Sequence, residues 1–125
     1  IPATTCVLEM NRQAAELNAK RIAMVTPYTD DVHNRILDNY EASGFLRPTG
    51  QNIGGTVSND FASIPADTLK DMVLSVAKSA PDMIMIMCTN LRGARVADNL
   101  SKELGIPVID SAAATLQAGY RLIER

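Results

Sequence analysis

The chain has 125 residues, of which 46% are hydrophobic and 21% are charged, and its formal net charge is −2. This length fits one domain, and the lack of a basic stripe argues against nucleic acid as a partner. The apolar runs are too short to cross a membrane, and the start of the chain does not resemble a signal peptide. Two cysteines 82 positions apart give neither a disulfide framework nor a metal-ligand spacing. We therefore expect a cytoplasmic globular protein without a metal or an organic cofactor.

Apolar periodicity alternates along the chain between the helical and the strand pattern. Short apolar runs rich in Ile, Met and Val predict buried strands, and amphipathic stretches between them predict helices. The predicted elements are, in chain order, a helix over residues 4–17, a strand over 21–26, a helix over 30–43, a short or irregular strand within 45–55, a helix over 63–80, a strand over 83–87, a helix over 91–104, a strand over 106–110 and a helix over 112–123.

Local signals support several of these boundaries and predict individual environments. Leu8, Ala14, Ala15 and Leu17 are expected to be the buried positions of the first helix. Ser63 is a candidate N-cap, with a proline two residues later in the first turn.

Strands that alternate with helices predict right-handed crossovers and a parallel sheet. The expected fold is a three-layer α/β domain, Rossmann-like or flavodoxin-like, with a four-stranded parallel sheet and helices on both faces. Residues 1–125 are expected to form this single domain.

Polar residues follow all four predicted strands at the points where the strands end. In an open parallel sheet, ligands bind beyond the carboxyl ends of the strands, so these tips should gather on one rim. The tips are Thr26-Pro27-Tyr28-Thr29, the loop from Gly54 to Asn59, Cys88-Thr89-Asn90 and Asp110-Ser111. The pattern predicts a lined pocket at this rim.

Cys88 is the strongest candidate within that rim because it ends the central strand and directly precedes a helix. Free amides at a helix start favour a thiolate or an anionic substrate. Position alone leaves open the alternative that Cys88 is a small buried hydrophobe. Cys6, in the first turn of a helix, is interpreted as structural, and His33, in a polar helix, is expected to be exposed.

Three known motifs do not fit. A cysteine phosphatase would need arginine where Ala94 stands, and a dinucleotide fingerprint would need glycines after the first strand. A receiver domain would need an aspartate in the place of Cys88.

Four segments together resemble the aspartate/glutamate racemase superfamily, within it the branch of maleate cis-trans isomerases and arylmalonate decarboxylases. The segments are Arg21-Ile-Ala-Met-Val-Thr-Pro-Tyr28, Asn59-Asp60, Cys88-Thr-Asn-Leu-Arg92 and Pro107-Val-Ile-Asp-Ser111. Proteins of this family have two similar α/β domains with the active site between them. The resemblance implies that this chain is the second, C-terminal half of such an enzyme.

The same resemblance implies roles for individual residues. Cys88 would be the second catalytic cysteine, and Tyr28 would hydrogen-bond a substrate carboxylate. The substrate-binding residues would be Asn59, Thr89, Asn90 and Pro27, with the backbone of Thr89 and Asn90 cradling an oxyanion. From the residues alone, Tyr28 could also be a sheet-edge tyrosine and Asn59 a turn residue.

The implied activity is a cofactor-independent isomerisation of maleate to fumarate. The alternatives are an arylmalonate-type decarboxylase, an Asp/Glu-type racemase, or a domain that only binds carboxylates. The expected partner is a small dicarboxylate or malonate-like substrate, with neither nucleic acid nor membrane. An apolar face that would meet another domain could also support a homo-oligomer.

Overall fold

The structure is a computed structural model that describes residues 1–124. It contains five α-helices, one 3-10 helix and four strands in the described residues. In chain order they are α1 (Cys6–Glu16), β1 (Ile22–Thr26), α2 (Asp30–Ala42), β2 (Thr49–Asn52), η1 (Ser58–Ser63), α3 (Ala66–Ala77), β3 (Met83–Ile86), α4 (Ala94–Leu104), β4 (Val108–Asp110) and α5 (Ser111–Ile123).

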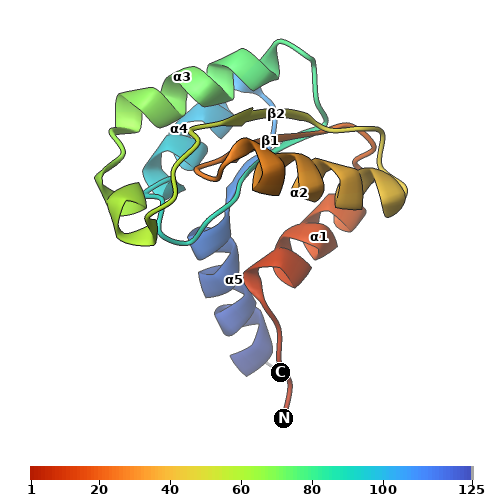
Figure 1. The fold of residues 1–125 in the computed structure, drawn as a ribbon. Helices are drawn as coiled ribbons and strands as arrows, with labels where there is room; N and C mark the ends of the chain where they lie inside the picture. The colour runs from red at the N-terminus through yellow and green to blue at the C-terminus, as the bar shows by residue number, and fades with distance from the viewer. Residues whose placement is uncertain (125) are drawn as a thin grey trace.

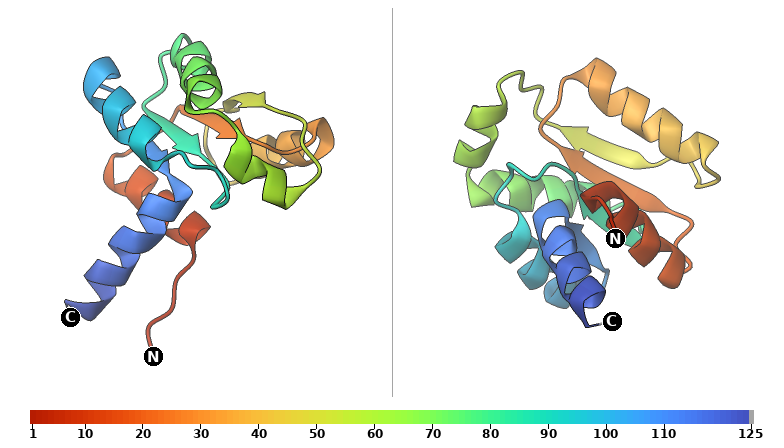
Figure 2. Two further views of the ribbon diagram at one scale, coloured as in Figure 1. Left: turned by 90° about the vertical axis from the view of Figure 1, so that its left-hand side faces the viewer. Right: turned by 90° about the horizontal axis from the view of Figure 1, so that it is seen from below.

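The four strands form one parallel sheet in the order β2-β1-β3-β4. Helix α3 lies on the side of the sheet opposite to α1 and α5 (Figure 1). The predicted alternation of helices and strands, the parallel sheet and the three layers are therefore confirmed. One face of the sheet packs against α3 and α4, and the other packs against α1, α2 and α5. The segment before α1 and the last turns of α5 extend to the same side of the molecule (Figure 2).

The two central strands, β1 and β3, are buried because both faces of the sheet are covered there, whereas the edge strand β2 has no buried residue. All five residues of β1 and all four of β3 are buried. Alternate residues serve opposite layers, since successive side chains of a strand point to opposite faces. Ile84 and Ile86 join the layer of α3 and α4, whereas Met83, Met85 and Met87 join the layer of α1, α2 and α5.

Some predicted boundaries and environments were wrong. Ala14 is buried, but Leu8, Ala15 and Leu17 are exposed, because Glu9, Met10 and Gln13 form the inner face of α1. Other differences concern helix starts and loops: Pro65 instead of Ser63 is the N-cap of α3, α4 begins at Ala94, and the loop after β2 contains η1.

His33 is buried, with 4% of its surface exposed, and the prediction that it lies in solvent was wrong. Its Nδ1 lies 2.8 Å from the hydroxyl oxygen of Thr26. Its ring packs over β2 at Gly50, where a Cβ atom would stand only 2.3 Å from Nε2. The polar helix therefore places its one histidine against the sheet, where a glycine makes room for the ring.

We expect His33 to make the fold sensitive to mild acid. Burial lowers the pKa of His33 below its ordinary value of 6.5, and the charge of Asp30 only partly offsets this. The folded state therefore favours the neutral ring, and stability is lost as the pH falls through 6.5. Urea unfolding at pH 8 and pH 5 should show a larger loss for the wild type than for His33→Gln. Equal losses in the two proteins would contradict this role.

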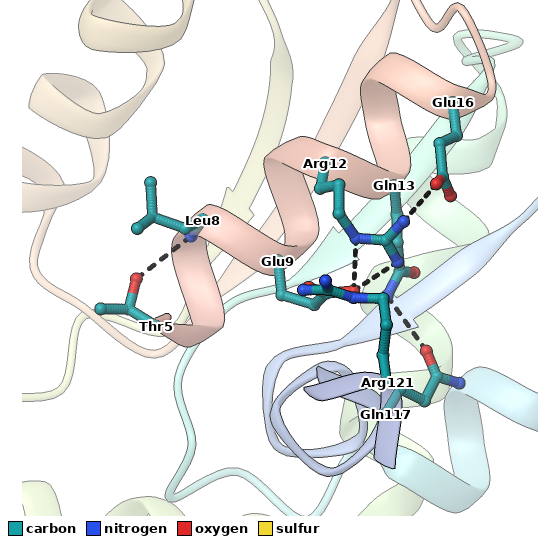
Figure 3. Close-up of polar contacts among 8 residues, drawn as sticks. All are labelled: Thr5, Leu8, Glu9, Arg12, Gln13, Glu16, Gln117 and Arg121. Atoms are coloured by element: carbon teal, nitrogen blue, oxygen red, sulfur yellow. Dashed lines mark hydrogen bonds and ion pairs between the residues drawn. The ribbon is translucent and has the colours of Figure 1, made fainter. Parts of the chain in front are cut away.

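Helices α1 and α5 are joined by a buried carboxylate. Glu9 on α1 is 1% exposed and accepts hydrogen bonds from Arg12 Nε and Arg121 Nη2, each at 2.8 Å (Figure 3). Gln13 Nε2 donates to Gln117 Oε1 at 3.0 Å in the same interface. These contacts fix where α1 crosses α5, and thus where the first turn of α1 lies.

Within residues 1–124, no helix has the length and apolar character needed to cross a membrane.

Candidate active site

The loops after β1 and β2 are tied together at the carboxyl edge of the sheet. The carbonyl oxygen of Tyr28 accepts hydrogen bonds from Asn52 Nδ2 at 2.9 Å and from Gly54 N at 3.0 Å. Gly55 N donates to the Pro27 carbonyl at 2.8 Å. The strand order places β1 beside β2, so one short set of bonds holds both tips. These hydrogen bonds fix the backbone that carries the Tyr28 side chain.

A cavity of about 740 Å³ opens at this edge. It lies among the first turn of α1, the start of α2, the loop around η1 and the ends of β1 and β3. The residues that line it are Cys6, Val7, Tyr28, Thr29, Val32, Ile36, Gly55, Thr56, Ser58, Phe61, Met87, Cys88, Thr89 and Asn90. A pocket is therefore present at the tips of β1, β2 and β3, as predicted, but Asp110 and Ser111 after β4 do not line it.

Cys88 is half-buried in the cavity wall and has an unusual backbone. Its φ of 142° lies in a region that residues other than glycine rarely adopt. Its N–H donates to Ser111 Oγ at 3.2 Å, and its carbonyl accepts from Leu91 N at 3.1 Å. Strained residues that persist in a folded protein cluster at functional sites. This strain is a second reason, besides position, to regard Cys88 as functional.

Tyr28 lies beside Cys88 and is held in place by Phe61. The two aromatic rings pack edge to face, with centroids 6.1 Å apart. Burial in the first place, and then the nearby thiols of Cys88 and Cys6, together raise the pKa of Tyr28 to about 12. The phenol therefore stays protonated at neutral pH. A neutral hydroxyl donor of this kind suits a carboxylate or an enolate oxygen.

Asn90 connects the end of β3 with the loop around η1. Its Nδ2 donates to Ser58 Oγ at 2.5 Å and to the Ser58 carbonyl at 3.2 Å. The neighbouring Asn59 is exposed and is not among the residues lining the cavity. Ser58 lines the cavity in the place that the sequence predicted for Asn59. Pro27 is buried and does not line the cavity; its carbonyl takes part in the hydrogen bonds that join the two loops. Of the predicted residues, the structure brings Tyr28, Cys88, Thr89 and Asn90 together.

Cys6 lines the same cavity as Cys88, whereas its position in the first turn of a helix had indicated only a structural role. The connectivity of the chain could have predicted this position of Cys6. Helix α1 leads directly into β1 and runs back along the sheet, so its first turn must lie near the carboxyl edge. Cys6 thus faces the rim, although its helix ends at the opposite edge.

The cavity has one polar and one apolar side. Tyr28, Cys88, Thr89 and Asn90 provide hydroxyl, thiol and amide groups, while an apolar side consists of Val7, Val32, Ile36 and Met87. The amino ends of α1, α2 and α5 lie at this edge, and their dipoles favour an anion. No three His, Cys, Asp or Glu side chains among residues 1–124 lie close enough to hold a metal ion. The arrangement suits a small anion that carries an apolar portion.

A model of the arylmalonate decarboxylase family matches residues 1–125. This chain belongs to that family. It is 30% identical over 125 residues to an arylmalonate decarboxylase of Bordetella bronchiseptica, and 26% identical over 99 residues to a maleate isomerase of Nocardia farcinica. These alignments cover 98% and 78% of this chain, but only 52% and 39% of the relatives. The chain thus spans about half the length of the decarboxylase that it matches, and less of the isomerase.

Solved structures of this family share the fold. A variant of arylmalonate decarboxylase with two substitutions involving cysteine, in a liganded form, superposes on this chain with a TM-score of 0.88 and is 26% identical to it. The match covers 98% of this chain and 53% of the decarboxylase. A maleate isomerase from Pseudomonas putida S16 also superposes with a TM-score of 0.88, at 21% identity, and the match covers 98% of this chain and 50% of the isomerase. The resemblance to the branch of maleate isomerases and arylmalonate decarboxylases is confirmed, and the relatives are enzymes.

Proposed function

We propose that this domain carries one side of a cofactor-independent active site, which transfers a proton at the carbon beside a carboxylate of a small dicarboxylate. The observation that carries the proposal is the placement of Cys88 beside a protonated Tyr28 in one cavity. Tyr28 would bind a carboxylate oxygen as a neutral donor. Cys88 would deliver or remove the proton, a task that a thiol performs once it is oriented on the substrate.

The first candidate reaction is the isomerisation of maleate to fumarate. A thiolate adds to one alkene carbon, the resulting carbanion is protonated, the new single bond rotates, and loss of the proton and the thiolate restores the double bond. Cys88 would be the proton donor and acceptor, with the adding thiolate supplied from outside this domain. By its resemblance to maleate isomerases, the run Cys88-Thr89-Asn90 favours this reaction. A maleate isomerase of Nocardia farcinica has been solved with a covalently bound succinylcysteine intermediate.

The second candidate is decarboxylation of a malonate that carries an apolar group. One carboxylate leaves as CO₂, and the remaining enediolate takes a proton from Cys88. The apolar side of the cavity, formed by Val7, Val32, Ile36 and Met87, supports this alternative because maleate has no group to fill it.

We further propose that a second α/β domain covers the cavity and completes the site. Val7 and Val32 line the cavity yet are 39% and 43% exposed. Apolar side chains gathered at the mouth of a pocket are typical of a surface that meets a partner. The half-length match to the decarboxylase agrees with this arrangement.

The two reactions are separated by incubating the complete protein with maleate and with phenylmalonate. We expect fumarate from maleate, detected by chromatography. Phenylacetate and CO₂ from phenylmalonate, without fumarate, would assign the second reaction. Binding of both acids without turnover would leave only a carboxylate-binding role, and failure to bind either would contradict the proposal. The 125-residue chain alone should show no turnover if a second domain completes the site.

A further inference from the structure

The strained backbone at Cys88 needs contacts that hold it. A φ of 142° is costly for a residue with a side chain, and such a conformation persists only when its surroundings impose it. Met87 N donates to the Val25 carbonyl at 2.9 Å, which fixes the residue before Cys88. Leu91 N bonds to the Cys88 carbonyl at 3.1 Å, which fixes the turn after it. Between these two anchors, the Cys88 amide donates to the hydroxyl of Ser111 at 3.2 Å.

Ser111 is well suited to impose this conformation because it is itself immobile. It is 1% exposed and is the first residue of α5. Asp110 before it is also 1% exposed and caps the helix, with Oδ1 accepting from Ala113 N at 2.9 Å. The carboxylate fits beside α4 only because position 93 is a glycine, where a Cβ would lie 2.7 Å from Oδ2. The serine hydroxyl is thus anchored by the start of a helix and not by a mobile loop.

We propose that Ser111 is a positioning residue for Cys88. Its hydroxyl oxygen holds the Cys88 amide so that the end of β3 keeps the strained conformation and the thiol stays in the cavity wall beside Tyr28. Without this acceptor, the backbone relaxes to a negative φ and the thiol turns away from its half-buried place. The consequence for catalysis, a loss in kcat with little change in KM, rests on the proposed function. The positioning itself does not.

The test measures the reactivity of both cysteines in one molecule. The protein is treated with iodoacetamide at pH 8, and the alkylation rates of Cys88 and Cys6 are followed by peptide mass spectrometry. Ser111→Ala should raise the ratio of the Cys88 rate to the Cys6 rate about fivefold or more, because Cys88 is released locally. Ser111→Thr, which restores a hydroxyl, should return the ratio to within twofold of wild type.

Thr115→Val is the matched control. It removes a hydroxyl one turn further along α5, which donates to the Ser111 carbonyl at 2.8 Å, and leaves the Ser111 hydroxyl in place. The ratio should not change in this variant. An unchanged or lower ratio in Ser111→Ala, or equal acceleration of both cysteines, would overturn the proposal.

A measurement on the wild type covers the case in which Ser111→Ala does not fold. Hydrogen exchange followed by NMR should show a protected Cys88 amide, since it is bonded to a buried hydroxyl. Free exchange of that amide would overturn the proposal. Neither experiment uses a substrate, so an inactive protein with a well-positioned Cys88 would contradict the proposed function alone.

Discussion

Replacing Cys88 with serine should lower kcat/KM of the complete protein on the order of 10³-fold, the range lost when a positioned acid or base is removed. The serine hydroxyl is similar in size to the thiol, but it is far less acidic and cannot exchange a proton with carbon at neutral pH. Because Cys88 is half-buried and serine fits the same space, the fold should persist. Activity measured with maleate and with phenylmalonate, alongside a thermal melt, gives the result.

Cys6→Ser is the matched comparison for that experiment. Cys6 is half-buried and lines the same cavity, but it sits in the first turn of α1 and not at a strand tip. We expect its replacement to change kcat/KM less than tenfold. If Cys88→Ser kept activity within threefold of the wild type, the assignment of Cys88 would be wrong. A larger loss for Cys6→Ser than for Cys88→Ser would move the chemistry to the first turn of α1.

The second large effect is a loss of folding stability, which we expect when Glu9 at the interface of α1 and α5 is replaced. Hydrogen bonds from Arg12, together with those from Arg121 and the charges of both groups, lower the pKa of Glu9 from 4.5 to about 2, against the opposing effect of burial. A shift of this size corresponds to about 3 kcal/mol of stability at neutral pH. Glu9→Gln should therefore lower the free energy of unfolding by about 3 kcal/mol at pH 7.

The difference in free energy of unfolding between the wild type and Glu9→Gln should become smaller as the pH falls. Because the pKa of Glu9 is depressed in the folded state, its stabilisation is fully present above pH 4.5 and is lost as the pH falls through 2. The gap between the wild type and Glu9→Gln in urea unfolding should therefore narrow from pH 7 to pH 2.

Glu16→Gln provides the control for Glu9. Glu16 pairs with the same Arg12, but its side chain is 62% exposed. Its removal should cost at most about 0.5 kcal/mol, as for other exposed ion pairs. Equal effects of the two substitutions, or a Glu9 effect independent of pH, would show that the buried network does not stabilise the fold.

Local sequence patterns were sufficient to predict the layered α/β fold, the buried strands and the gathering of Tyr28, Cys88, Thr89 and Asn90. These features depend on short-range periodicity and on a topological rule that places the carboxyl ends of parallel strands at one edge. An apolar run such as Met83–Ile86 carries its own signal for burial, because few other environments accept it.

The tertiary structure alone decided the environments of the polar helix residues. Glu9 and His33 are buried, and Cys6 faces the cavity, because of where α1 and α2 lie on the sheet and what packs against them. A polar side chain in an amphipathic helix can be buried only if partners satisfy it. Glu9 has one partner in its own helix, Arg12, but its second partner, Arg121, stands on α5, and the partner of His33, Thr26, stands on β1. No pattern within one helix contains Arg121 or Thr26, so only the assembled fold determined these contacts.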